Sequence, residues 1–377
     1  MKRQYPVNIV LKKELIMRKR IAWVLLVVVA LSAFLGCAAP QKSEEPEKTQ
    51  EEATAPAEEN EEEATEEAAE PSAESTPEEQ SVTIRLGGLK GPTSMGMVKL
   101  LDDAENSLTE NKYEFTMAGS ADELTPKLLK GELDILAVPA NLGAILYSNS
   151  EGAVQMLAVN TLGVIYIVEK GGESINSIED LKGTTIFATG KGSTPEYALT
   201  YLLSQHGLKI GEDVTVEWKS EPTEVVAAMS GEGNFIAMLP QPFVTVASTQ
   251  IENLRVALDL TKEWEALDNG SAFVTAGLII RKAFAEENPE AVAKFIDEYR
   301  ASTEYVNANV DDAAQLIEKY DIVKAPVAKK AIPFCNIVCI TGDEMVTMVK
   351  GYFEVLAEQN IKAVGGKLPE DDFFWVK

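Results

Sequence analysis

Histidine is almost absent from this sequence, and its scarcity excludes several kinds of site. The 377 residues include one histidine. A histidine metal cluster or a histidine-dependent triad needs partners that a chain with His206 alone largely lacks. The pattern of apolar residues predicts a helix over 195–207, and we interpret His206 as a residue at its C-terminal end. We therefore expect no metal site and no cofactor.

Cysteine is also rare. Cys37, Cys335 and Cys339 are too few for a disulfide-based scaffold. Cys335 and Cys339 are four positions apart, a spacing that fits disulfide geometry poorly in a strand and marginally in a helix. Two buried thiols are the favoured interpretation. A disulfide is the alternative, and a metal site is less favoured still.

Charge is distributed unevenly along the chain. The formal net charge is −26, with +6 in residues 1–37 and −14 in residues 38–80, so residues 81–377 carry −18. A folded part this acidic lacks the net positive charge typical of nucleic-acid-binding domains and would be repelled by anionic lipid. With 45% hydrophobic residues, the chain is long enough to bury two ordinary cores.

The N-terminal residues have the pattern of an export signal. The basic segment 17–20 precedes an apolar segment, 21–36, which is too short to span a bilayer comfortably, and Cys37 follows directly. Residues 1–37 resemble a bacterial lipoprotein signal peptide, which implies a lipid anchor on Cys37. They depart from the usual pattern at Phe34 and Leu35, and Met17 is an alternative start. A retained membrane anchor would give the same topology.

Residues 38–80 contain sixteen glutamates and no large apolar residue. Such a segment cannot bury enough surface to fold, and we predict a disordered acidic tether. As a random coil it would span roughly 35–40 Å.

Predicted strands lead into short loops at four places, and a helix follows each loop. The strands cover 82–86, 134–138, 184–188 and 235–239. Their loops are Gly-rich or Pro-rich, and a helix that starts there leaves backbone N–H groups without intrahelical partners. Alternation of strands and helices predicts a doubly wound, mostly parallel α/β sheet. Loops at the carboxyl ends of such strands are where ligands bind.

The same order of elements occurs twice. Gly91-Pro-Thr-Ser94 matches Gly192-Ser-Thr-Pro195 in composition and position, and the strands at 134–138 and 235–239 both end in proline. We predict two α/β lobes, lobe I from residues 81–170 and 270–377 and lobe II from residues 171–269. Two crossings would join them as a hinge able to close about a solute. Helices are expected to make up the rest of the C-terminal part.

These loops together resemble a known family. Cys37, the acidic tether, Gly91-Pro-Thr-Ser-Met-Gly96, Pro139-Ala-Asn141, Gly190-Lys-Gly-Ser-Thr-Pro195, Pro240-Gln-Pro242 and Thr275-Ala-Gly-Leu278 resemble the type II periplasmic-binding fold. The nearest group is the substrate-binding lipoproteins of ABC importers for nitrate, sulfonates, taurine and thiamine precursors. The resemblance covers about residues 82–377.

The resemblance implies a ligand site in the cleft between the lobes. The implied ligand-binding residues are Pro92, Thr93, Ser94, Met95, Pro139, Ala140, Asn141, Gly192, Ser193, Thr194 and Gln241. Helix N-termini and hydroxyl groups can hold a small anion or a polar neutral group. Relatives that bind amino acids or dicarboxylates hold the ligand carboxylate with an arginine side chain. None of Arg85, Arg255, Arg281 and Arg300 lies in these loops, so such ligands are disfavoured here. Lys191 could pair with an acid of the ligand, although a solvated lysine is the preferred interpretation.

The predicted function is that of an extracytoplasmic solute-binding lipoprotein of an ABC-type importer. It would be a monomer that captures a small polar or anionic organic solute and delivers it to a permease and its ATPase, with no enzymatic activity. One alternative is a sensor built on the same lobes. Another is an enzyme of the pyrimidine-precursor or menaquinone-pathway type on the same fold. The enzyme is disfavoured because the loops hold no cysteine, histidine or acidic pair, and Asp134 is interpreted as structural.

Overall fold

The computed structural model describes residues 81–376, which belong to one compact unit. The predicted signal peptide, the lipidation site Cys37 and the acidic tether lie outside the described residues. None of the described helices is both long and apolar enough to cross a membrane.

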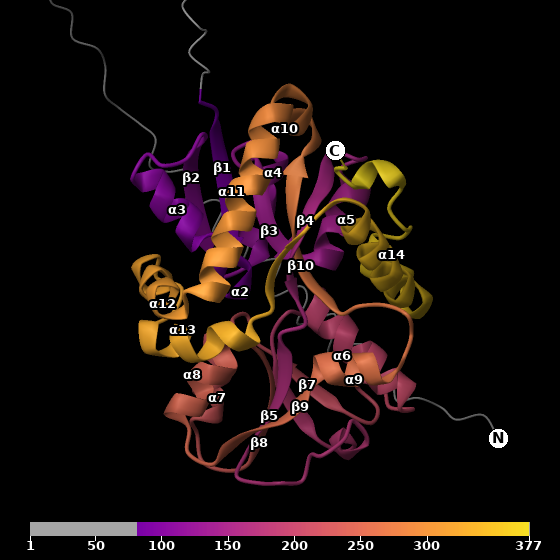
Figure 1. Ribbon diagram of the computed structural model, residues 1–377. Coiled ribbons are helices and arrows are strands. Elements are labelled where there is room, and N and C mark those ends of the chain that lie inside the picture. Colours follow the sequence, from indigo (N-terminus) through magenta and orange to yellow (C-terminus); the bar gives the residue numbers. More distant parts are fainter. Residues whose placement is uncertain (1–80, 377) are drawn as a thin grey trace, which may run out of the picture. The chain divides into compact units, whose positions relative to one another are not determined.

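The described strands form two sheets (Figure 1). The six-stranded sheet has the order β11-β4-β10-β3-β1-β2, and the five-stranded sheet has the order β7-β6-β8-β5-β9. The first sheet comprises β1 (Thr83–Leu89), β2 (Lys112–Ala118), β3 (Ile135–Pro139), β4 (Val154–Leu162), β10 (Val274–Arg281) and β11 (Ile337–Ile340). The second comprises β5 (Ile165–Lys170), β6 (Thr185–Ala188), β7 (Thr215–Trp218), β8 (Phe235–Pro240) and β9 (Leu254–Asp259).

Helices cover both sheets. Around the first sheet, Figure 1 shows α3 and α11 on one side and α5 and α14 on the other. The helices are α2 (Pro92–Met95), α3 (Val98–Glu105), α4 (Thr125–Leu129), α5 (Ala140–Asn149), α6 (Thr194–Gln205), α7 (Pro222–Met229), α8 (Phe243–Gln250), α9 (Leu260–Ala266), α10 (Lys282–Glu287), α11 (Pro289–Ala308), α12 (Val310–Lys319), α13 (Ala325–Ala331) and α14 (Gly342–Gln359). We call residues 81–162 and 274–376 the first lobe, and residues 163–273 the second lobe.

Strand direction confirms the predicted α/β fold class. β1, β2 and β3 are parallel, as are β6, β7 and β8. β5 and β10 carry the chain between the lobes, and each is antiparallel to both of its neighbours. Because most strands in each sheet share one direction, their carboxyl ends meet at one edge, where loops can build a site.

The predicted boundary of lobe I at residue 170 is wrong. Residues 165–170 form β5, which pairs with β8 and β9 in the second sheet. The chain crosses at Gly163 and Val164, immediately after β4. Gly171 is only a turn inside the second lobe, with φ of 77°. At Gly163 a Cβ atom would lie 2.0 Å from Thr261 Oγ1, so the close packing of this crossing against α9 requires glycine.

The prediction that residues after β10 are helical apart from loops also needs correction. Ile337-Val-Cys-Ile340 forms β11, an edge strand that pairs with β4. Ile337, Val338 and Ile340 are β-branched residues, which favour strands. Pairing with β4 therefore holds this segment in a strand although helices precede and follow it. Cys335 and Cys339 are both free thiols, and only Cys335 is fully buried. Burial raises the pKa of the Cys339 thiol to about 11.

Helix starts in this fold are capped in different ways. Ser120 and Glu123 form a capping box, which opens a 3-10 turn, Ala121–Glu123. Thr341 makes no side-chain capping bond at the start of α14. His206 ends α6 as predicted, with its Nδ1 atom 2.7 Å from Glu179 Oε1.

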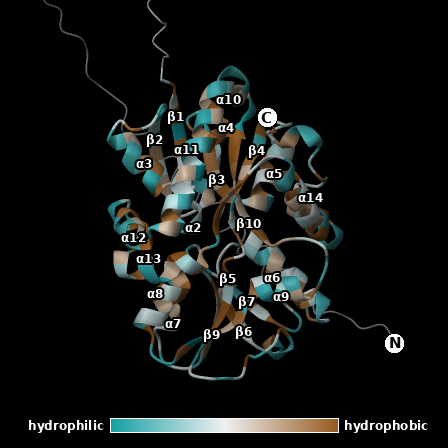
Figure 2. Cartoon of the chain, viewed as in Figure 1, coloured by the Kyte–Doolittle hydropathy of each residue, from teal (hydrophilic) through white to brown (hydrophobic). Residues whose placement is uncertain are grey.

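Apolar strands form the interior of both lobes, and hydrophilic residues lie mainly on outer helices and loops (Figure 2). Aromatic side chains join the lobes beside the second crossing. Trp264 of α9 is fully buried, with ring centroids 5.2 Å from Phe273, 4.8 Å from Tyr201 and 5.4 Å from Tyr352 of α14. Such pairs stabilise beyond the area that they bury. Trp264 is thus part of the contact between the lobes rather than a wall of a ligand site.

Two buried carboxylates anchor the sheets. Asp134 is fully buried, 2.6 Å from Arg85 Nη2 and 2.7 Å from Arg281 Nη2, which agrees with its predicted structural role. Burial disfavours its ionised form, but the hydrogen bonds of both arginines outweigh that effect and lower the pKa of Asp134.

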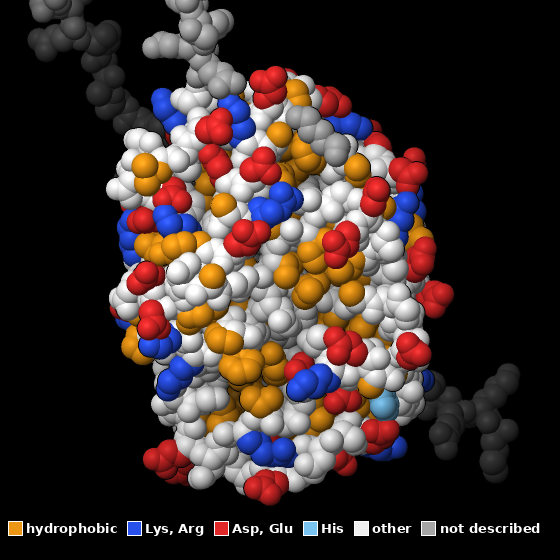
Figure 3. Space-filling model, viewed as in Figure 1, with side chains coloured by type: hydrophobic (Ala, Val, Ile, Leu, Met, Phe, Trp, Pro, Cys, Tyr) orange, Lys and Arg blue, Asp and Glu red, His pale blue; other side chains and the backbone are white. Residues whose placement is uncertain are grey.

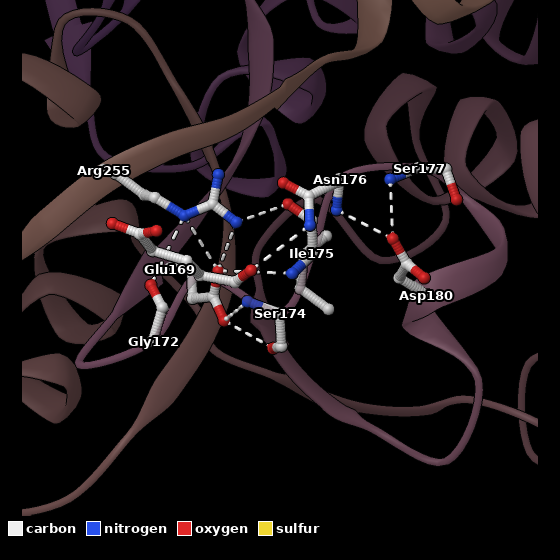
Figure 4. Close-up of polar contacts among 9 residues, drawn as sticks. Glu169, Gly172, Ser174, Ile175, Asn176, Ser177, Asp180 and Arg255 are labelled. Atoms are coloured by element: carbon white, nitrogen blue, oxygen red, sulfur yellow. Dashed lines mark hydrogen bonds and ion pairs between the residues drawn. The ribbon is translucent and has the colours of Figure 1, made fainter.

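Glu169 is the second buried carboxylate, and Figure 4 shows its contacts. It accepts hydrogen bonds from Arg255 Nη2 at 2.6 Å and from the Ser174 amide at 2.9 Å. Arg255 also donates to the Gly172 carbonyl. Burial opposes ionisation, but these donors and the Ile175 amide lower the pKa of Glu169 overall. The network fastens the segment after β5 to β9.

Candidate functional site

A cavity of about 500 Å³ lies between the two lobes. Its lining comes from the ends of strands. The first lobe contributes residues 89–93 after β1, 119–122 after β2, the end of β3, and Thr275 with Ala276 on β10. The second contributes residues 189–193 after β6, the loop after β7, the end of β8, and Val164 with Ile165 at the crossing. The volume falls in the range of sites for small organic molecules.

Helix N-termini surround this cavity. Residues that line it include Pro139, which precedes α5, Ser193, which precedes α6, and Phe243, the first residue of α8. Neither α5 nor α6 has a side-chain hydrogen bond that caps its N-terminus, whereas the Thr245 amide in the first turn of α8 donates to Gln241 Oε1 at 3.3 Å. The first amides of each helix lack intrahelical partners, and the helix dipole favours negative charge there.

Burial divides the lining into a floor and a rim. Thr93, Thr189 and Thr275 are buried, whereas Lys191 and Asp122 are exposed. Apolar side chains form most of the remaining walls, and proline is prominent among them. These walls include Leu89, Pro92, Pro139, Leu142, Val164, Ile165, Pro195, Pro222, Pro240 and Phe243.

The charges on the lining are three lysines and one aspartate. Lys90 Nζ lies 3.4 Å from Asp321, and Lys219 Nζ lies 3.4 Å from Glu217. Lys191 has no hydrogen-bond or ion-pair partner among residues 81–376. Other acidic side chains lie beside the rim, which therefore carries charges of both signs.

Five of the predicted ligand-binding residues line the cavity: Pro92, Thr93, Pro139, Gly192 and Ser193. Their contact with a solute remains a prediction. Thr93 Oγ1 makes a long hydrogen bond of 3.3 Å to the Leu89 carbonyl, so its hydroxyl is only weakly held.

The other six predicted residues lie outside the lining: Ser94, Met95, Ala140, Asn141, Thr194 and Gln241. The Ser94 hydroxyl donates a 2.7 Å hydrogen bond to the Leu89 carbonyl. Gln241 Oε1 accepts from the Thr245 hydroxyl at 2.9 Å. Met95 and Ala140 are fully buried in the first lobe. Helical geometry turns these side chains inward, away from the loop tips that face the cavity.

Asn141 and Thr194 have another use. Thr194 Oγ1 donates to Asn141 Oδ1 at 3.1 Å, and Asn141 Nδ2 donates to the Ala363 carbonyl at 3.1 Å. Both side chains are fully buried. Because Asn141 lies in the first turn of α5 and Thr194 begins α6, this hydrogen bond joins the two lobes at residues outside the cavity lining.

Several lining residues were missed by the sequence analysis. Lys219 and Ser220 follow β7 directly, and the rule that strand ends build the site could have found them. Thr275 lies at a bulge of β10, and its Oγ1 atom is buried without a partner among the described residues. Nothing in the local sequence marks the bulge.

The lining contains no cysteine or histidine among the described residues, and Asp122 is its one carboxylate. No group of three or more potential metal ligands occurs in residues 81–376. The arrangement can bind a solute through dipoles, hydroxyl groups and lysines. It offers no pair of side chains placed for general acid and base chemistry.

A family model described as "Menaquinone biosynthesis" matches residues 93–332, more than half of the chain. The chain belongs to this family. The matched region includes both crossings and every part of the cavity lining except residues 89–92. Membership in the menaquinone biosynthesis family does not by itself say whether this member acts on a substrate or only binds a solute.

Curated relatives of this family member include proteins of Brucella abortus and Brucella suis that are named as binding proteins. They are 24% identical over 207 residues, which cover 54% of this chain. The chain spans 61% of the length of these relatives.

Solved structures share the fold. An ABC transporter protein of Parabacteroides distasonis is 24% identical, with a TM-score of 0.65 over 79% of this chain and 100% of its own. The periplasmic aliphatic sulphonate binding protein of Escherichia coli is 18% identical, with a TM-score of 0.63 over 78% and 92%. A ligand-binding component of an ABC-type import system from Staphylococcus aureus is 16% identical, with a TM-score of 0.62 over 78% and 97%.

Proposed function

We propose that this protein is the extracytoplasmic solute-binding component of an ABC-type importer. It would bind a small solute between its lobes and pass it to a permease and ATPase without altering it. A lipid on Cys37 and the segment 38–80 would hold it at the membrane. The observation that carries the proposal is the cavity, which is formed by both lobes and ringed by helix N-termini.

Closure of the lobes would follow from the way that the cavity is built. Each lobe supplies only part of the lining, so a bound solute contacts both lobes at once only when they are together. A solute shifts a conformational equilibrium by its difference in affinity for the two states. The crossings at 163–164 and 267–273 are the segments that would bend.

A second candidate is an enzyme, because the family model is described by a biosynthetic pathway. Most enzymatic steps on a small organic molecule need a group that takes or gives a proton. The cavity offers Asp122 and lysines for this purpose, all on the rim, while its buried floor carries threonine hydroxyls. The chemistry of the lining therefore favours binding over turnover.

The experiment that tests the proposal measures solute-dependent thermal stabilisation. The full chain, purified in detergent, would be screened with nitrate, sulfonates, taurine, pyrimidines and small carboxylic acids. A solute at about 100 times its Kd should stabilise the protein by about 2.7 kcal/mol. NMR of the recovered solute should show no conversion. Conversion would support the enzyme instead.

A matched pair of variants tests whether binding occurs in the cavity. Ser220 lines the cavity just before α7, and Ser230 follows the same helix outside the lining; both are exposed. Ser220→Trp should block the cavity and abolish the solute-induced shift, whereas Ser230→Trp should retain it. Equal shifts in both variants would place the bound solute elsewhere and contradict the proposal.

A further inference from the structure

A buried asparagine of the first lobe is hydrogen-bonded to a residue that lines the cavity. On the face shown in Figure 3, acidic and basic side chains are interspersed, and neither sign gathers into a large patch. Inside the lobe, Asn160 of β4 is only 1% exposed, and its Nδ2 atom donates to the Thr93 carbonyl at 3.0 Å. Thr93 lines the cavity, whereas Asn160 does not. Asn160 can therefore affect a solute only through the loop that carries Thr93.

The loop after β1 makes few contacts that fix its position by itself. Its helix, α2, is four residues long, and no side chain caps its N-terminus. A single helical turn is not stable alone in water. The Ser94 and Thr93 hydroxyls donate to the Leu89 carbonyl within the same segment, and the second of these bonds is long, at 3.3 Å. The Lys90 amide, bonded to the Ala118 carbonyl at 2.9 Å, ties down the start of the loop.

β4 gives Asn160 a rigid position from which to hold the loop. This strand pairs with β10 on one side and with β11 on the other. The Thr161 hydroxyl, fully buried beside it, donates to Asn160 Oδ1 at 3.2 Å. An amide side chain has one oxygen that accepts and one nitrogen that donates. With its oxygen engaged by Thr161, Asn160 directs its nitrogen at Thr93.

A second buried side chain holds the far end of the same segment. Ser302 of α11 donates from its hydroxyl to the Gly96 carbonyl at 2.7 Å and accepts from the Leu100 amide at 3.0 Å. The bond to Thr93 differs from this one because its acceptor belongs to the cavity lining itself. A buried carbonyl that loses its donor is destabilised until water reaches it. Without Asn160, the loop would therefore shift toward arrangements in which the Thr93 carbonyl is hydrated.

We infer that Asn160 is a positioning residue for solute binding, which holds the loop of residues 89–93 in the place where it lines the cavity. This role rests on the proposed binding function. A loop that is already in place does not have to be ordered by the solute. The apparent affinity falls in proportion to the fraction of molecules in which the loop is in place.

The test replaces Asn160 and measures binding and loop mobility separately. Asn160→Leu keeps a similar size and removes the donor. It should weaken each solute that the wild type binds by about five- to tenfold, the effect of one lost hydrogen bond. The probes are nitrate, taurine, butanesulfonate, uracil and benzoate, titrated by calorimetry into the full chain at a temperature where every variant is folded. Hydrogen exchange of residues 89–97 without solute should be faster in the variant.

Asn111→Leu is the matched control. Asn111 is also a buried asparagine of the first lobe, 4% exposed, and its Nδ2 atom donates to the Ala291 carbonyl at 2.9 Å. It lies outside the cavity lining. This variant should lose stability in chemical denaturation as Asn160→Leu does, but solute affinity and exchange of residues 89–97 should stay at wild-type values.

Asn160→Ser provides a milder change and serves alone if Asn160→Leu does not fold. The shorter hydroxyl can reach the Thr93 carbonyl only through a water molecule, so the loss of affinity should be smaller than in the leucine variant. Solute affinity and loop exchange that both match the wild type in the folded Asn160 variants would overturn the inference.

Two other results would also overturn it. An equal loss of affinity in Asn111→Leu would assign the effect to general stability, and a loss for one solute alone would indicate direct contact with that solute. In each of these cases the wild type still binds, and the proposed function stands. If the wild type binds no solute of the thermal screen, the proposed function fails and the positioning role falls with it.

Discussion

The hydrogen bond between Thr194 and Asn141 gives a sharp prediction about how the lobes close. Thr194 Oγ1 donates to Asn141 Oδ1 at 3.1 Å, and neither side chain lines the cavity. Thr194→Val keeps the shape of the side chain and removes the hydroxyl. It leaves a buried amide oxygen without its donor, which costs about 1–3 kcal/mol.

That cost falls on the closed arrangement of the lobes, because the two residues belong to different lobes. If the two residues separate when the lobes open, losing about 1.4 kcal/mol from the closed arrangement lowers the ratio of closed to open protein tenfold. The affinity for every solute should then fall by the same factor. Selectivity between solutes should not change, since the side chain does not touch the ligand. Calorimetry with two solutes of different affinity measures both quantities.

Thr200→Val is the matched control. Thr200 lies on the same helix, but its hydroxyl donates to the Glu196 carbonyl at 2.7 Å within that helix. This variant should leave solute affinity unchanged. An unchanged affinity in Thr194→Val, or a loss for one solute and not for the other, would refute the closing role of the bond.

Three further variants test the structure. Arg255→Met leaves the buried Glu169 without its cation and should lower the free energy of unfolding by about 3 kcal/mol near pH 7 in chemical denaturation. The folded-state pKa of Glu169 is below its ordinary value of 4.5, so the ionised carboxylate stabilises the fold above pH 4.5, and this contribution is lost as the pH falls through the folded pKa. The difference in unfolding free energy between the variant and the wild type should therefore shrink in acid. A difference that does not depend on pH would contradict this account. Gly163→Ala brings a Cβ atom against Thr261 Oγ1 and should lower the free energy of unfolding by about 1–3 kcal/mol. Adding Thr261→Gly should partly restore stability in the double variant. If the losses of the two single variants simply add, the contact is not the cause. Ser94→Ala should cost about 1 kcal/mol of stability with solute affinity unchanged, because the Ser94 side chain does not line the cavity and its hydroxyl donates to the Leu89 carbonyl; a loss of affinity would restore the original prediction for this residue.

The loops that were predicted to face a ligand contribute to one cavity, but only some of the side chains named on them line it. Four strand-to-helix loops line one cavity. These loops could be predicted because glycine, proline and a change in the spacing of apolar residues are local sequence signals. Which side chain faces the cavity depends on its position around the helix, and neighbouring residues point in different directions. Thr93 therefore lies on the lining, whereas Ser94 next to it bonds to Leu89.

The sequence alone determined the alternation of strands and helices, the doubled architecture and the acidic balance of the folded part. These properties depend on residue type and short-range spacing, which are visible without coordinates. It also indicated the structural role of Asp134, because a carboxylate at the start of a buried strand needs partners.

Only the tertiary structure decided the crossing at Gly163, the bond between Asn141 and Thr194, and the bond from Asn160 to Thr93. β5 is buried along nearly its whole length, like β3 and β10 of the first lobe, so its sheet is chosen by the strands that it can pair with. Asn141 and Thr194 are 53 positions apart. Asn160 and Thr93 are 67 positions apart, and they meet only because packing brings β4 against the loop after β1.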